Sequence, residues 1–185
     1  MVKILVVIDV QNDFIDGALR NEEAIKRVPN IVNEIYYGNW DGIVATQDTH
    51  YSHSYEWLEE GRRLPIPHCI KGTRGWDIQK DVLDTIRLKT ENFIILEKEN
   101  FGALDLPDAV WAIYEGIATD CTEDILVEFV GFCTDICVIS NVMLFKASLR
   151  RGTIQVKESC CAGVTKESHD TALKAMQACH IDIVD

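Results

Sequence analysis

The apolar run at the start of the sequence is the feature that most constrains the fold. Residues 3–9 read KILVVID, so apolar side chains continue without alternation until Asp9. A strand of this kind is buried on both faces, which is typical of a parallel sheet covered by helices on both sides. Because the run meets a charged residue early and has no small-residue cleavage site, we interpret it as a strand and not as a signal peptide.

The rest of the sequence alternates between strand and helix patterns. We predict further strands at 42–46, 93–97, 124–130, 153–158 and 181–184, and helices at 22–37, 78–86, 108–114, 136–149 and 166–179. Residues 48–73 contain Pro65, Pro67, Gly61 and Gly72 and are expected to form a long excursion. The pattern predicts one domain over residues 1–185 with an α/β fold: three-layer, Rossmann-like, with a mostly parallel six-stranded sheet and helices on both faces.

Net charge, hydropathy and cysteine content limit the partners and the location of the protein. The formal net charge is -12, whereas nucleic acids and anionic membrane surfaces require a basic face, so we expect neither as a partner. No apolar run approaches the length of a transmembrane helix. The seven cysteines are odd in number and irregular in spacing, which indicates a reduced, cytoplasmic chain.

Three reactive residue types follow predicted strands. Asp9, Lys98 and the loop that holds Cys137 each come at a strand end, and the carboxyl ends of parallel strands share one edge of the sheet. Taken singly, the Asp is more often a turn former, the Lys a solvated charge and the Cys a small core residue. An acid, a base and a thiol at one edge favour a catalytic site.

Cys133 and Cys137 lie four residues apart in GFCTDICV. This is not the spacing of a zinc knuckle or of a thioredoxin-like pair, and a disulfide does not suit a reduced compartment. One of the two is a candidate nucleophile at a helix N-terminus. There the helix dipole and a nearby lysine would favour the thiolate, and free amides could hold an oxyanion.

Four segments together resemble one enzyme family. They are DVQNDFIDGAL at 9–19, PHCIKGTRGW at 67–76, EKENFGA at 97–103 and GFCTDICV at 131–138. In this order they are similar to the motifs of the isochorismatase-like cysteine hydrolases, in the nicotinamidase/pyrazinamidase branch. The resemblance implies a cysteine-dependent amidohydrolase that releases ammonia from a small amide, such as nicotinamide or pyrazinamide, through a thioester intermediate.

The resemblance also assigns catalytic roles. It makes Cys137 the nucleophile, Asp9 the proton acceptor and Lys98 the residue that supports both. The backbone N–H groups of Cys133 and Cys137 are the expected oxyanion donors. The peptide bond Phe132–Cys133 is expected to be cis, as the corresponding bond is in the family.

A metal site is implied by the same resemblance. Asp48, His50 and His68 match the family's ligands, and Glu60 is the expected fourth, with His53 as its alternative. Asp48 and His50 are two residues apart, so in an extended segment their side chains point to one side. One divalent ion is expected, zinc first and iron or manganese as alternatives; a polar loop without metal is the other reading.

The sequence departs from the family near the expected substrate pocket. Leu64 and Pro65 stand where nicotinamidases have a tryptophan, so Phe14 and Phe132, or Trp57 or Tyr55, would have to supply the apolar wall. This departure leaves open an N-carbamoyl or ureido substrate, and a non-catalytic scaffold homologue is a third alternative. A homo-oligomer is expected from the family.

Two histidines lie outside every motif. His169 and His180 are expected at the surface or at helix ends.

Overall fold

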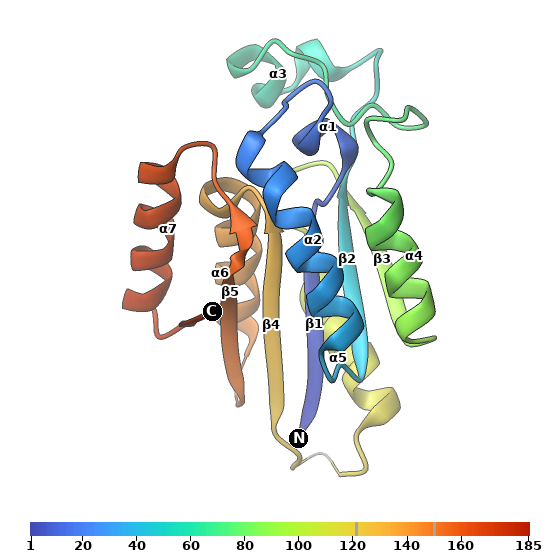
Figure 1. The fold of residues 1–185 in the computed structure, drawn as a ribbon, viewed down its shortest axis with the longest axis vertical. Coiled ribbons are helices and arrows are strands. Elements are labelled where there is room, and N and C mark those ends of the chain that lie inside the picture. The colour runs from blue at the N-terminus through green and yellow to red at the C-terminus, as the bar shows by residue number, and fades with distance from the viewer. Residues whose placement is uncertain (121, 150) are drawn as a thin grey trace.

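Six strands form one sheet in the computed structural model, which describes residues 1–120, 122–149 and 151–185. The strands are β1 (Val2–Ile8), β2 (Gly42–Asp48), β3 (Phe93–Lys98), β4 (Ile125–Phe132), β5 (Thr153–Ala162) and β6 (Asp182–Val184). Their order is β3-β2-β1-β4-β5-β6, and every neighbouring pair is parallel (Figure 1). The direction of strand addition reverses between β1 and β4, and ligands of open α/β sheets bind at such a switch point.

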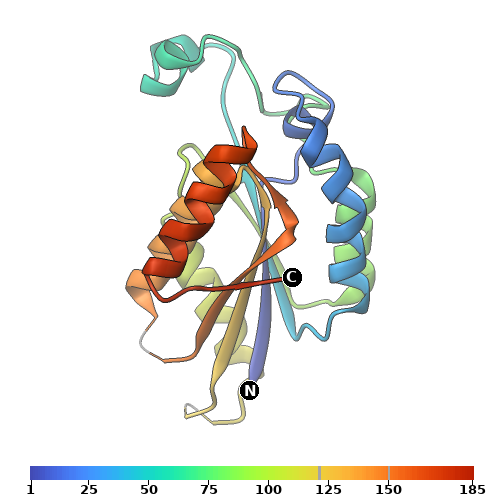
Figure 2. The same ribbon diagram turned by 60° about the vertical axis from the view of Figure 1, so that its left-hand side comes forward.

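Helices cover both faces of this sheet. They are α1 (Asn12–Ile15), α2 (Glu22–Tyr37), α3 (Glu59–Arg63), α4 (Lys80–Lys89), α5 (Leu106–Ile117), α6 (Ile139–Ser148) and α7 (Lys166–Ala178), with short turns η1 (Tyr55–Trp57) and η2 (Thr134–Val138). Figure 2 shows α2 and α4 on one face and α5, α6 and α7 on the other. Each layer closes its own apolar core against the sheet. The prediction of a three-layer α/β fold is therefore confirmed.

The local sequence explains where the central elements begin and end. All side chains of β1 except that of Lys3 are buried, as expected for a strand with helices on both sides. Helix α2 begins after Asn21, whose side chain accepts hydrogen bonds from the N–H groups of Glu23 and Ala24. Its apolar stripe places Ile31 and Ile35 in the core.

A glycine lets β4 approach β1 closely. Gly131 has φ +123°, and a Cβ there would lie 2.1 Å from the carbonyl oxygen of Ile8. A larger residue would therefore push apart the two strands that flank the switch point.

The structure differs from the predicted elements at the functional end of the sheet. Helix α1 was not predicted because its four residues are too few to show a helical period. The predicted helix at 136–149 divides into the π-type turn η2 and helix α6, and strand β5 continues to Ala162. Residues 48–73 form the expected excursion but contain η1 and α3.

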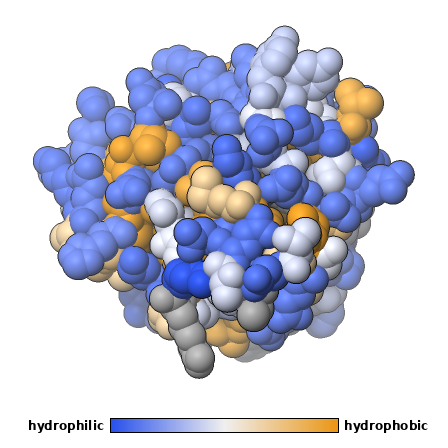
Figure 3. Space-filling view, turned by 90° about the horizontal axis from the view of Figure 1, so that it is seen from below, coloured by the Kyte–Doolittle hydropathy of each residue, from blue (hydrophilic) through white to orange (hydrophobic). Residues whose placement is uncertain are grey.

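The other end of the sheet presents an ordinary polar surface. Seen from below, it is mostly hydrophilic, with a few small apolar patches between the hydrophilic residues (Figure 3). Among the described residues, no helix combines the length and apolar character needed to cross a membrane.

A buried carboxyl lies between the sheet and α2, away from the functional end. Glu128 on β4 is 3% exposed and accepts a hydrogen bond from Gln155 on β5. Its Oε1 has no hydrogen-bond partner among the described residues, while Lys157 nearby pairs with Glu34 at 2.8 Å. Burial raises the pKa of Glu128 to about 7.

This raised pKa predicts a pH-dependent stability. The carboxyl ionises near pH 7 when folded but near its ordinary value of 4.5 when unfolded, so the free energy of unfolding falls as pH rises between these values. Glu128→Gln keeps a neutral group and should raise the free energy of unfolding at pH 8 by about 1–3 kcal/mol, with little effect near pH 4.5. Denaturant unfolding at several pH values measures this, with the exposed Glu115→Gln as control. An equal effect of Glu128→Gln at pH 5 and pH 8 would contradict the assignment.

Candidate functional site

The ends of β1, β2 and β3 bring three charged side chains together. Lys98 Nζ lies 2.7 Å from Asp9 Oδ2 and 3.1 Å from Asp48 Oδ1. All three side chains are at most 3% exposed. Because β1, β2 and β3 are adjacent and parallel, residues distant in the sequence meet at one edge of the sheet. The predicted convergence of Asp9 and Lys98 is thus seen, with Asp48 as a second carboxylate on the same ammonium.

Thr46 holds Asp9 from the neighbouring strand. Its hydroxyl donates to Asp9 Oδ1 at 2.7 Å and accepts from the Asp9 N–H at 3.1 Å. Asp9 also has a positive φ of 48°, which turns the chain sharply away from the end of β1. The carboxylate is therefore fixed by its strand, by Thr46 and by Lys98.

Cys137 lies in the turn η2, directly after β4. Its Sγ is 3.8 Å from Lys98 Nζ and is buried. The preceding bond Phe132–Cys133 is cis, as expected from the family resemblance. The carbonyl of Cys133 accepts hydrogen bonds from the N–H groups of Ile136 and Val138, which closes the turn around Cys137.

Burial and pairing with opposite charges act in opposite directions on the pKa values in this cluster. Burial raises the pKa of Asp9, although Lys98 opposes the shift. It also raises the pKa of the Cys137 thiol well above its ordinary value, against the lowering effect of Lys98. Burial disfavours the charge on Lys98, but Asp9, Cys137 and Asp48 outweigh it and raise the pKa of that ammonium. The resting site therefore holds a thiol beside a carboxylate that is a stronger base than usual.

Asn141 joins the turn of Cys137 to the loop after Lys98. This fully buried side chain donates to the carbonyls of Cys137 at 2.8 Å and Phe101 at 3.0 Å, and it accepts from the N–H of Ala103 at 2.8 Å. Its amide is thereby used almost completely. Asn141 therefore fixes the turn that carries the Cys137 thiol relative to the loop that follows Lys98.

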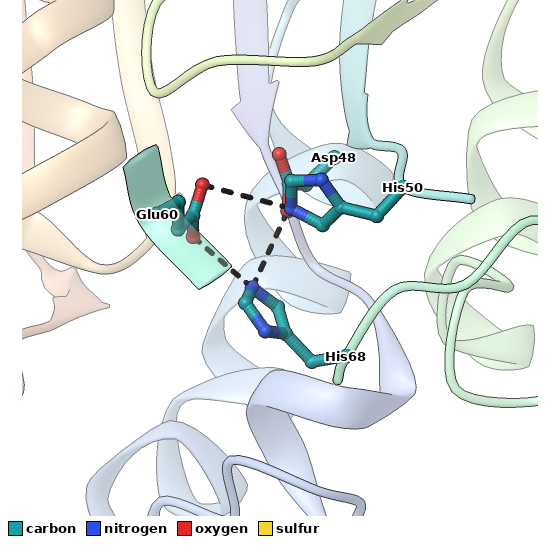
Figure 4. A group of neighbouring side chains, drawn as sticks. All are labelled: Asp48, His50, Glu60 and His68. Carbon is teal, nitrogen blue, oxygen red and sulfur yellow. Dashed lines mark ion pairs between the residues drawn. The ribbon is translucent and has the colours of Figure 1, made fainter. Parts of the chain in front are cut away.

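Four side chains near Asp9 and Lys98 form a group that could hold a metal ion. Candidate ligand atoms of Asp48, His50, Glu60 and His68 all lie within 4.8 Å of one another (Figure 4). His50 Nε2 is 2.9 Å from Asp48 Oδ2, and His68 Nε2 is 3.3 Å from Glu60 Oε1. Asp48 ends β2, Glu60 lies on α3, and the two imidazoles come from the connecting segments.

The backbone and Tyr55 position the two histidines. His50 donates its N–H to the carbonyl of Cys69, and its own carbonyl accepts from Lys71, so the segment just after His68 pairs with the extension of β2 on both sides of Ile70. His68 Nδ1 is 3.0 Å from the carbonyl oxygen of Ile66 and 3.2 Å from the Tyr55 hydroxyl. These contacts leave Nε2 facing the other three ligands.

Asp13 anchors the excursion against α1. Its Oδ2 accepts the N–H of Cys69 at 2.7 Å and its Oδ1 that of Ala18 at 2.9 Å. Gln11 adds a second link, donating from Nε2 to the carbonyls of Asp48 and Trp76, both at 2.8 Å. The long excursion, which carries three of the four candidate ligands, is therefore fixed to the end of β1.

A cavity of about 880 Å³ opens over the thiol and the four-residue group. Its apolar lining comes from widely separated segments and includes Phe14, Leu19, Leu64, Phe101, Ile136 and Val164. Arg20 and Arg63 stand among its polar lining. Such a volume is at the upper end for small-molecule sites.

Several predicted site residues lie elsewhere. Phe132, expected in the pocket, is fully buried in the core beneath α2 and α4 and does not line the cavity. His53 is exposed with its ring near Tyr51, outside the four-residue group, so the structure places Glu60 and not His53 with the other ligands. Trp57 is 73% exposed, and Tyr55 packs against the rings of His50 and His68.

One of the motif-free histidines lies near a helix end but not at the surface. His180 is exposed, but His169 is buried, because α7 turns it inward against η2. The helical period did contain this signal, since Ala172, Leu173 and Met176 continue the same buried side of α7. Thr46 and Asn141 carried no such signal, because their partners are distant in the sequence.

Comparisons with solved structures find the same overall fold in known proteins. The chain is similar in structure to nicotinamidase/pyrazinamidase PncA from Bacillus subtilis, with a TM-score of 0.81, 25% identity and full coverage of both chains. Pyrazinamidase/nicotinamidase from Streptococcus mutans UA159 has a TM-score of 0.79 and 26% identity over 98% of this chain and 99% of that one. Pyrazinamidase of Pyrococcus horikoshii in complex with zinc, 24% identical with a TM-score of 0.75 over 99% and 98% of the two chains, shares the fold.

A comparison with curated protein sequences found no match. The model of the isochorismatase domain matches residues 3–185, which is nearly the whole sequence. The chain therefore belongs to the isochorismatase family.

Proposed function

We propose that this protein is a cysteine-dependent amidohydrolase that releases ammonia from a small amide through a thioester. The observation that carries the proposal is the buried contact series Asp9–Lys98–Cys137, at 2.7 and 3.8 Å, which ends at a thiol that lines the cavity. An acid, an ammonium and a thiol in contact are the parts that acyl transfer through a cysteine requires. The activities for which the Bacillus subtilis and Streptococcus mutans proteins are named support nicotinamide and pyrazinamide as the first substrates to test.

The first half of the reaction forms the thioester. Asp9 accepts the proton of the Cys137 thiol as sulfur attacks the amide carbonyl carbon, and Lys98 stabilises the negative charge that passes between them. The raised pKa of Asp9 makes it a better proton acceptor than an ordinary carboxylate. The N–H groups of Cys133 and Cys137 stabilise the oxyanion. When the C–N bond breaks, Asp9 returns the proton to nitrogen and ammonia leaves.

The second half of the reaction releases the acid. A water molecule gives a proton to Asp9 and attacks the thioester carbonyl carbon. The C–S bond then breaks, the sulfur recovers a proton from Asp9, and the carboxylic acid leaves the cavity. Asp9 thus carries one proton in each direction, and no histidine base is needed.

The four-residue group fits a divalent metal ion. Neither ring nitrogen of buried His50 has a hydrogen-bond partner of acceptable geometry among the described residues, which a metal at Nε2 would explain in part. Two imidazoles with two carboxylates suit zinc, and also iron or manganese. A bound ion would supply a Lewis-acid position for a donor atom of the substrate. Asp48, His50, Glu60 and His68 would hold it beside the cavity that Cys137 also lines.

The volume and lining of the cavity also favour testing larger amides and ureido compounds. Its volume of about 880 Å³ exceeds what one six-membered ring fills, and Leu64 gives it an aliphatic wall. An ammonia-release screen should therefore pair nicotinamide and pyrazinamide with bulkier apolar amides and with N-carbamoyl compounds. If carbamoyl compounds are turned over faster, they are the substrate class in place of small amides. If no compound in the screen releases ammonia, the proposed hydrolase function is wrong.

The nucleophile is tested by a matched pair of cysteine variants. Cys137→Ala should lower kcat by at least ~10³-fold, because no other group can form the thioester. Cys133→Ala should keep most of the activity, because only its backbone N–H is used. Ammonia release with melting temperatures for both variants measures the difference. Loss of activity in Cys133→Ala but not in Cys137→Ala would show that the assignment is wrong.

The metal site is tested by elemental analysis after reconstitution with Zn²⁺. Wild type should hold about one equivalent, while His50→Ala and Glu60→Gln should hold much less because each loses a ligand. His53→Ala is the matched control and should keep its metal. His50→Ala should raise KM and lower kcat on a pyridine amide, yet leave alkylation of Cys137 by iodoacetamide unchanged. Less than about a tenth of an equivalent in wild type would rule out the site.

A further inference from the structure

His169 contacts the turn η2, which carries Cys137, without lining the cavity. Its Nδ1 lies 2.8 Å from the hydroxyl oxygen of Thr134, the first residue of η2. Thr134 is fully buried and His169 is 8% exposed. Burial lowers the pKa of His169, so at neutral pH the ring is uncharged and suited to a hydrogen bond with a hydroxyl. None of the steps proposed above uses this buried pair.

A second contact joins the same two segments. The N–H of Val164 is 3.1 Å from Asp135 Oδ1 and 3.2 Å from Oδ2, so the residue after Thr134 is held by the chain that leads into α7. This chain packs closely on α7, because a Cβ at Gly163 would lie 2.8 Å from the Cβ of His169. Asn21 fixes it from the other side by donating to the carbonyl of Gly163 at 2.8 Å.

The contacts at η2 divide into two groups. Asn141 holds the carbonyl of Cys137, at the end of the turn near Lys98. His169 and Val164 hold Thr134 and Asp135, at the beginning of the turn. The turn contains only five residues, so we expect a shift at Thr134 to move Cys137 and to change the distance of its sulfur from Lys98.

We propose that His169 is a positioning residue for the nucleophile, and that it acts through Thr134 to keep Cys137 Sγ beside Lys98 Nζ. This inference rests on the proposed hydrolase function. His169 touches neither the cavity nor the reacting atoms, so its contribution is to the geometry of the thiol alone. Removing the hydrogen bond should lower both the rate of catalysis and the reactivity of Cys137, while substrate binding at the four-residue group should persist.

The test uses four variants and one control. His169→Leu keeps bulk without a polar ring nitrogen, and Thr134→Val removes only the hydroxyl. The double variant combines them, and His169→Asn places a polar atom near the former Nδ1. His180→Asn is the control, since His180 is exposed and asparagine tolerates its φ of 61°. Each protein is compared for melting temperature, for kcat and KM on the amide that wild type turns over fastest, and for the iodoacetamide alkylation rate of Cys137.

His169→Leu and Thr134→Val should each lower kcat and the alkylation rate by roughly tenfold with little change in KM. The double variant should be no slower than the slower single one, because both changes remove one hydrogen bond. His169→Asn should recover most of both rates.

Lower melting temperatures with unchanged rates would overturn the proposal, because His169 would then be only structural. Losses that multiply in the double variant would overturn it too, since the two residues would act separately. If His169→Leu does not fold, Thr134→Val and His169→Asn decide between the same outcomes. Alkylation needs no substrate, so failure of the amide screen would count against the hydrolase and not against this inference.

Discussion

The buried ammonium of Lys98 is the interaction on which the site depends. It lies between the carboxylates of Asp9 and Asp48 and touches the sulfur of Cys137. Buried charges are costly unless they are paired, and here each carboxylate has the same cation as a partner. Without Lys98, two like charges would remain at the ends of adjacent strands. The lysine therefore pairs with both the proposed base, Asp9, and one of the four residues of the candidate metal site, Asp48.

The parallel sheet brings these charged residues together although they are distant in the sequence. Asp9, Asp48 and Lys98 end β1, β2 and β3, and the register of these strands sets their separations. Cys137 enters from β4, on the other side of the switch point. The strand ends supply the three charged residues of the site. The excursion after β2 supplies candidate metal ligands, and the turn after β4 supplies the thiol.

The site is held rigid by residues that take no part in the proposed reaction or in the candidate metal site. Asn141 joins the turn η2 to the loop after Lys98, and Thr46 fixes Asp9. Asp13 and Gln11 fix the excursion that carries His68. Each of these side chains is buried and uses its hydrogen-bonding atoms on backbone or carboxylate partners. A site built in this way keeps its geometry without a bound substrate.

The sequence predicted the elements whose signal is local. The apolar run of β1, the helical period of α2 and the strand-end positions of Asp9 and Lys98 could all be read from neighbouring residues. Thr46 and Asn141 could not, because their roles arise only when distant segments meet. Phe132 was expected in the cavity but follows the alternation of β4 into the core, and His53 lies outside the ligand group. A cytoplasmic location and a homo-oligomer stay predictions.

The most direct test of the central claim is the alkylation rate of Cys137 in Lys98→Met at neutral pH, with Lys71→Met as the control on an exposed lysine. Peptide mapping by mass spectrometry assigns the label to Cys137 and not to the other cysteines. The account predicts that Lys98→Met alkylates about tenfold or more slowly than wild type, because the cation that lowers the thiol pKa is gone, while Lys71→Met matches wild type. Equal rates for wild type and Lys98→Met would contradict it.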